Sequence, residues 1–170
     1  AGAGGSEGNA MHDVGSLLPL ACETPEEFQS TGPGRFWVRQ ALTGNSILVR
    51  QGGQPQDYEL RRLPLDAVRP SQSGEDYDND SSRHLATALQ KFLVASEGGD
   101  PEAIRQAYDS VRKEDLNPIV VHGGEIVDGN HRHAAHKLNG SDAILALVST
   151  GPGSGKIGNL RQFVKEAQSG

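Results

Sequence analysis

The chain has 170 residues and a formal net charge of -6, and its composition, 35% hydrophobic with 22 glycines, predicts a domain with a modest core and many loops. It has no run of Lys and Arg of the kind that grips duplex nucleic acid, so a small anionic ligand is favoured over a long polyanion. No apolar stretch approaches the roughly 20 residues of a membrane-spanning helix. Cys22, the single cysteine, excludes an internal disulfide and a cysteine-based zinc site. We therefore expect a cytoplasmic site of action and no membrane partner.

The chain begins with a Gly-rich segment, residues 1–16, which is typical of a flexible leader on a fragment or a processed chain. Thr24-Pro25-Glu26-Glu27 then predicts the start of a short helix. Thr is a good N-cap, Pro suits the first helical position, and acidic residues suit the first turn.

A β-hairpin is predicted next. Residues 35–42 and 46–50 flank Thr43-Gly44-Asn45, a pattern that indicates two short strands joined by a three-residue turn. Together with the short helix, this hairpin makes residues 17–57 an N-terminal accessory unit.

Residues 58–150 predict an α+β domain in which a small mixed sheet carries packed helices. One helix is indicated by apolar residues at helical spacing, with Ser81 or Ser82 as its predicted N-cap, and another by the Asp100-Pro101-Glu102 start signal. The predicted strands are 58–65, 119–121, 125–127 and 143–148, and a further helix is predicted over 130–138. Residues 151–170 predict a Gly-rich linker and a tail helix.

The chemistry is concentrated between Pro118 and Gly140, PIVVHGGEIVDGNHRHAAHKLNG. A strand that enters a tight Gly turn and then a helix directs backbone N–H groups and the positive end of the helix dipole at one point. Asp128, Gly129, Asn130, His131, Arg132 and His133 occupy this turn. The pattern predicts a site for phosphate or another compact anion.

Each of these residues has a functional role and a simpler alternative. Arg132 would offer a planar fork to phosphate oxygens or would form a surface salt bridge. His131 would donate a proton or merely position the helix. Asp128 would orient Arg132, bind Mg²⁺ through water, act as a base or serve the turn alone. Gly129 would allow a positive φ and a close backbone approach.

His133 and His136, three residues apart, resemble a metal pair but are more typical of a solvated helix face, so no metal ligands are assigned.

Two further segments resemble a calcium loop and a nucleotide-binding loop, but each lacks residues that the motif requires. Asp76, Asp78 and Asp80 match the start of a calcium loop, but Ser81 and Thr87 stand where such a loop needs Gly and Glu. The segment 151–156, GPGSGK, suggests a nucleotide-binding loop, but it lacks the first Gly and the Ser or Thr after Lys156.

The order of elements over residues 58–148 resembles the ParB/sulfiredoxin-like superfamily. The residues that carry the resemblance are 63–70, 85–89, 117–121, 125–132, 134–135 and 139–140. Asp-Gly-x-His-Arg at 128–132 is the specific part. The resemblance implies that this turn holds nucleotide or protein-bound phosphate and that Asp66 and Arg69 form the opposite wall of the pocket. Asn130 stands where the sulfinic-acid reductases of this superfamily carry Cys, so we do not expect sulfinic-acid repair. Partition proteins carry a Gly-Glu-Arg-Arg type segment where this chain has 129–132, and a basic helix-turn-helix domain where this sequence has a short tail, so we do not expect specific DNA reading.

We therefore expect a nucleotide- or phosphoester-binding domain that transfers or hydrolyses phosphate. ATP, ADP or CTP would be the nucleotide, Mg²⁺ the accompanying metal, and Asp128, His131 and Arg132 the catalytic residues. Superfamily members in bacterial toxins and phages suggest an effector, which would act with a partner or immunity protein. The alternatives are a nuclease acting on DNA or RNA, which the negative charge disfavours, and a non-catalytic module that binds nucleotide and gates a partner.

Overall fold

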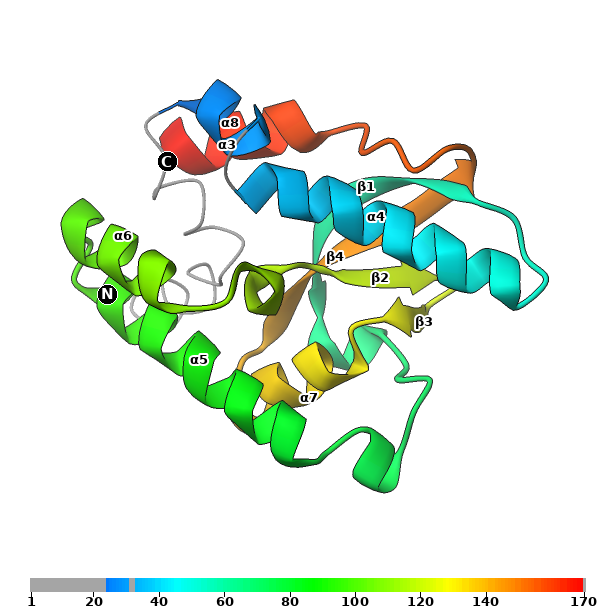
Figure 1. Ribbon diagram of the computed structural model, residues 1–170, viewed down its shortest axis with the longest axis horizontal. Coiled ribbons are helices and arrows are strands. Elements are labelled where there is room, and N and C mark those ends of the chain that lie inside the picture. Colours follow the sequence, from blue (N-terminus) through cyan, green and yellow to red (C-terminus); the bar gives the residue numbers. More distant parts are fainter. Residues whose placement is uncertain (1–23, 31–32, 170) are drawn as a thin grey trace.

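The computed structural model describes residues 24–30 and 33–169. In this part of the chain, six α-helices pack around a four-stranded mixed sheet (Figure 1). The α-helices are α3 (Pro25–Ser30), α4 (Pro33–Arg50), α5 (Asp80–Glu97), α6 (Pro101–Ser110), α7 (Asn130–Leu138) and α8 (Leu160–Ser169). The strands are β1 (Gln56–Pro64), β2 (Ile119–His122), β3 (Glu125–Asp128) and β4 (Ala143–Pro152). The short 3-10 helices are η2 (Leu65–Ala67), η3 (Gly74–Asp76) and η4 (Lys113–Leu116).

The sheet has the order β1-β4-β2-β3, which confirms the predicted α+β class with a mixed sheet. β4 pairs antiparallel with β1 and parallel with β2, and β2 pairs antiparallel with β3. Non-strand segments cover parts of both edges. The amide side chain of Asn159 bonds both the N–H and the carbonyl of Leu60 on β1, and Arg69 bonds Gly124 and Ile126 beside β3 through its backbone.

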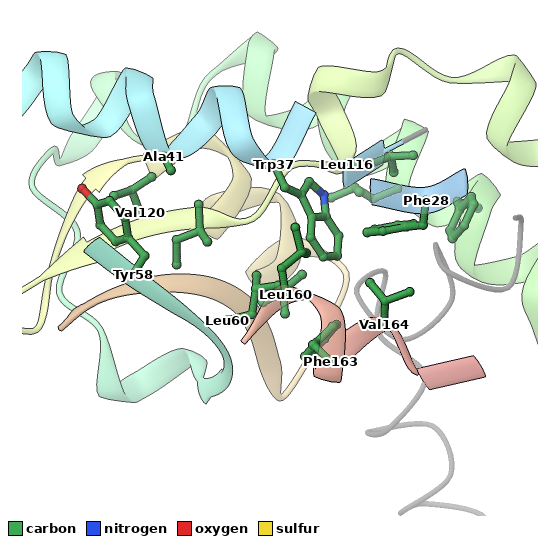
Figure 2. Packing of buried hydrophobic residues seen from close by; sticks show 14 of the residues in the cluster. Phe28, Trp37, Ala41, Tyr58, Leu60, Leu116, Val120, Leu160, Phe163 and Val164 are labelled. Atoms are coloured by element: carbon green, nitrogen blue, oxygen red, sulfur yellow. The ribbon is translucent and has the colours of Figure 1, made fainter. Parts of the chain in front are cut away.

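The main core lies on one face of the sheet. Alternating residues of β4, Leu145 and Leu147, contribute to it, as do side chains from every α-helix of the described chain. Figure 2 shows its centre, where Trp37 of α4 lies between Phe28 of α3 and Phe163 of α8. Both ring pairs meet edge to face, with centroids 4.9 and 6.1 Å apart.

A smaller core covers the opposite face. Ile144 and Ala146, the other alternating residues of β4, pack there with apolar residues of β2 and β3. Leu65 and Val68 lie over these residues. η2 and the residue that follows it therefore cover the second face, and the chain then runs alongside β3 towards α7.

The predicted N-terminal hairpin is wrong, because residues 33–50 form the single helix α4. Gly44 and Asn45 resemble turn residues but serve the packing of this helix. A Cβ at Gly44 would come within 2.7 Å of Val120 Cγ1, so only glycine lets α4 lie this close to β2. Asn45 bonds the backbone of Gln56 through both ends of its amide and accepts the hydroxyl of Tyr58 at 2.6 Å.

The predicted helix starts are mostly confirmed. The side chain of Thr24 accepts the N–H of Glu27 at 3.0 Å, and Asp100 accepts the N–H of Glu102 at 3.2 Å. The cap predicted at Ser81 or Ser82 is wrong. Asn79 caps α5 by accepting the N–H of Ser82 at 3.1 Å, which places Ser82 inside the first turn.

The segment predicted as a linker is held against β1. Lys156 and Gly158 form backbone hydrogen bonds with Tyr58, and α8 then packs its apolar side chains into the main core. The predicted leader, residues 1–16, and Cys22 lie outside the described residues. Among the helices of the described chain, none is long and apolar enough to cross a membrane.

Candidate functional site

The turn between β3 and α7 places an open helix N-terminus at the end of the sheet. Gly129 occupies the N-cap position with φ 108° and ψ 21°, and no side chain caps the helix. The first intrahelical bond runs from the N–H of His133 to the carbonyl of Gly129. The N–H groups of Asn130, His131 and Arg132 come before this first intrahelical donor and have no acceptor within the helix, and the helix dipole makes this end positive.

Gly129 has the positive φ that the sequence predicts, and packing explains why glycine is needed. A Cβ at this position would lie 2.6 Å from Ile119 Cγ2 and 3.1 Å from an Nη of Arg132. The inner side of the turn is therefore filled by this chain, and the N–H groups of the first helical turn are what remains to interact with a ligand.

Arg132 turns inward beneath this glycine. One Nη donates to the carbonyl of Pro118 at 2.8 Å. Burial lowers the pKa of its guanidinium, and the nearby carboxylates of Asp128 and Asp115 oppose that shift. No carboxylate of the described residues lies within ion-pair distance of Arg132, so its charge stays beside Gly129 with a neutral carbonyl as its partner.

Asp128, the last residue of β3, lies half-buried on the same turn. Its Oδ2 accepts a hydrogen bond of 2.8 Å from Nε2 of Gln40, a buried residue of α4. The helix that replaces the predicted hairpin thus reaches the site and fixes this carboxylate.

Asn130 joins the turn to the segment that carries Arg69. Its Oδ1 accepts the N–H of Ser71 at 2.9 Å, and its Nδ2 donates to the hydroxyl of Ser71 at 3.0 Å. The structure therefore brings the Arg69 segment next to the start of α7, with the Arg69 side chain exposed. Asp66 is exposed on η2 and forms no described hydrogen bond with the turn.

His131 contacts the first turn of α5, and His133 contacts the segment just before that helix. Nδ1 of His131 lies 3.2 Å from Oγ of Ser82, a side chain with no exposed surface. Nδ1 of His133 lies 2.6 Å from the hydroxyl of Tyr77, and its Nε2 lies 3.0 Å from the carbonyl of Leu65. His131 keeps partial exposure, whereas His133 is buried.

The expectation that His133 and His136 lie on a solvated face is wrong, because each is only 5% exposed. Burial, followed by the charges of Arg132 and His133, lowers the pKa of His136 to about 4. In the described part of the chain, no group of three or more His, Cys, Asp or Glu side chains could hold a metal ion.

The Gly-rich loop at 151–156 already binds an anion, and that anion is a carboxylate of this chain. The N–H groups of Ser154 and Lys156 both donate to Oδ1 of Asp57 at 3.0 Å. Asp57 thus takes the place that a ligand phosphate would have in a nucleotide-binding loop.

No protein-family model, curated protein or solved structure matches this chain.

Sequence reasoning missed several residues that support the turn: Gln40, Ser71, Tyr77, Ser82 and the carbonyl of Pro118. Each lies far from the turn in sequence or acts through its backbone. Tyr77 carried the clearest signal, as the single aromatic residue of an acidic segment.

Proposed function

We propose that the start of α7 binds a phosphate group of a nucleotide or phosphoester and that the protein hydrolyses or transfers that phosphate. The observation that supports this most strongly is the uncapped helix N-terminus at Gly129, next to an arginine that has no ion-pair partner among the described residues. Unpaired N–H groups and a nearby positive charge are the features that stabilise phosphate oxygens. The resemblance to ParB/sulfiredoxin-like proteins supports the same ligand class.

The proposed ligand includes a divalent cation because the carboxylate of Asp128 lies at the same turn. Its carboxylate lies at the end of β3 and would repel a bare phosphate. One of its oxygens bonds Gln40, which leaves the other to face a cation. Mg²⁺ commonly binds through one or two carboxylates together with phosphate oxygens, so Asp128 fits such a role. When bound, Mg²⁺ would neutralise charge on the phosphate oxygens.

The proposal predicts Mg²⁺-dependent nucleotide binding at the turn. In a ¹⁵N-resolved NMR titration with ATP, ADP or CTP, the amide signals of Asn130, His131 and Arg132 should shift and saturate when Mg²⁺ is present. Asp128→Asn should remove most of the Mg²⁺ dependence. Arg132→Gln should weaken binding about tenfold, because it removes one charge. Lys137→Ala, at the exposed far end of the same helix, is the matched control and should bind as the wild type does.

Turnover is followed separately by ³¹P NMR of the same mixtures. His131→Gln should reduce the rate about 100-fold while leaving the amide shifts in place, as expected for loss of an acid-base group. Thermal melting of each variant separates loss of function from loss of fold.

Absence of saturable shifts with all three nucleotides would refute the binding site. Cleavage of plasmid or RNA without nucleotide turnover would replace the proposal with a nuclease, and saturable binding with neither reaction would leave a nucleotide-gated module.

A further inference from the structure

The hydrogen bonds of Ser82 determine which nitrogen of His131 carries the proton. The hydroxyl of Ser82 has a single hydrogen and lies 2.5 Å from the carbonyl oxygen of Tyr77, which can only accept. The other oxygen nearby, Oδ1 of Asn79, lies at 3.5 Å. Asn79 donates through its Nδ2 to a backbone carbonyl at 2.7 Å, so its oxygen faces Ser82 and is also an acceptor.

Ser82 must therefore donate its hydrogen away from His131. Its oxygen can then only accept from Nδ1 of His131, at 3.2 Å. Nδ1 carries the hydrogen, and Nε2 of the neutral imidazole is left with a bare lone pair.

His133 holds the opposite tautomer. Its Nε2 faces the carbonyl of Leu65, so that nitrogen carries the hydrogen, and its Nδ1 accepts from the hydroxyl of Tyr77. Both nitrogens of His133 are used inside the protein, and the ring is buried. Of the two histidines, His131 is the one with a free nitrogen and partial exposure.

We infer that His131 acts as the proton acceptor of this site and that Ser82 is its positioning residue. This inference rests on the proposed function. In hydrolysis, Nε2 takes a proton from the attacking water as the water oxygen forms its bond to phosphorus. The bridging P–O bond breaks, and its electron pair leaves with the bridging oxygen of the nucleotide. His131 then releases the proton to solvent. His131 thus acts as a base, whereas the sequence alone suggested that it donates a proton.

The tautomer is measured first, on the wild-type protein without nucleotide, by long-range ¹H–¹⁵N NMR of the histidine rings. The neutral ring of His131 should show a protonated Nδ1 and a bare Nε2, whereas the neutral ring of His133 should show the reverse. Ser82→Ala removes the acceptor, so the second tautomer of His131 should appear. Ser82→Thr keeps the hydroxyl and should retain the wild-type tautomer. Ser81→Ala, at the exposed neighbouring position, is the matched control and should change nothing.

Kinetics then test the role. Ser82→Ala should lower kcat at least about tenfold with KM nearly unchanged, because it misplaces the base and leaves the phosphate contacts intact. Ser82→Thr should restore much of the rate.

A hydrogen on Nε2 of neutral His131 in the wild type would overturn the inference, whatever the protein binds. Conversely, the expected tautomer without nucleotide binding would refute the proposed function and leave the role of Ser82 in setting the tautomer intact. Equal kcat values for Ser82→Ala and the wild type would also reject the positioning role.

Discussion

The exposure and the charge of His136 depend more on its surroundings in the fold than on its neighbours in the sequence. It lies in the second turn of α7, where the pattern of the sequence suggests a solvated face, yet its side chain is 5% exposed. Its Nδ1 lies 3.3 Å from the hydroxyl of Ser141. Burial beside Arg132 and His133 disfavours a further positive charge, so the folded protein keeps this imidazole neutral.

This neutral histidine predicts a loss of stability in mild acid. Its pKa falls from 6.5 to about 4 on folding. Between these values the unfolded chain binds a proton that the folded chain does not, so the free energy of unfolding should decrease as pH falls, by up to about 1.4 kcal/mol per pH unit. Urea unfolding at pH 7.5, 6, 5 and 4.5 measures this slope. His136→Gln should flatten it, whereas His122→Gln, which alters an exposed histidine, should leave it steep. Equal slopes in both variants would contradict the assignment.

At the scale of an element, α4 combines turn-forming residues with a helical pattern. Its buried positions are Pro33, Gly34, Trp37, Gln40, Ala41, Gly44, Asn45 and Leu48. These positions recur at helical spacing, but five of the eight are small or polar, so a search for large apolar residues does not find the buried face of the helix. Gly44 is needed because α4 lies close to β2, and Asn45 is needed because it forms hydrogen bonds with β1.

The close contact between α4 and β2 predicts that Gly44 cannot be enlarged. Gly44→Val should lower the free energy of unfolding by about 1–3 kcal/mol, since its side chain would overlap the buried Val120. Thr43→Val, one position away on the exposed side of the helix, introduces the same residue and should change stability by less than about 0.5 kcal/mol. Urea denaturation of the two variants makes the comparison. Similar stabilities for both would mean that α4 does not approach the sheet as described.

At the scale of the whole molecule, the two ends of the described chain meet in one core. α3 and α8 lie side by side, and both pack around Trp37 of α4 (Figures 1 and 2). Phe163 of α8 also lies under the guanidinium of Arg62 of β1, 4.8 Å from the ring centroid. The C-terminal helix is therefore part of the structure that supports α4, which in turn carries Gln40 to Asp128.

This arrangement predicts that the tail helix matters for global stability. Phe163→Ala should reduce the free energy of unfolding by about 3 kcal/mol, because it removes a buried ring from the centre of the core. Lys165→Ala, on the exposed face of α8, should be nearly neutral. Unfolding followed by Trp37 fluorescence should report the change directly, since this is the single tryptophan of the chain. An unchanged midpoint for Phe163→Ala would show that α8 is dispensable.

Elements whose signals are local could be predicted from the sequence. The caps at Thr24 and Asp100 and the helix over 130–138 depend on residues within a few positions of each other, so short patterns predict them. Gly129 and the residues of its turn could be singled out for the same reason. The tertiary structure alone decided that α4 is a helix, that Arg132 turns towards Pro118 and that Ser82 faces His131. These outcomes depend on contacts between residues that lie distant in the chain, where packing and the need to satisfy buried polar groups outweigh local preference.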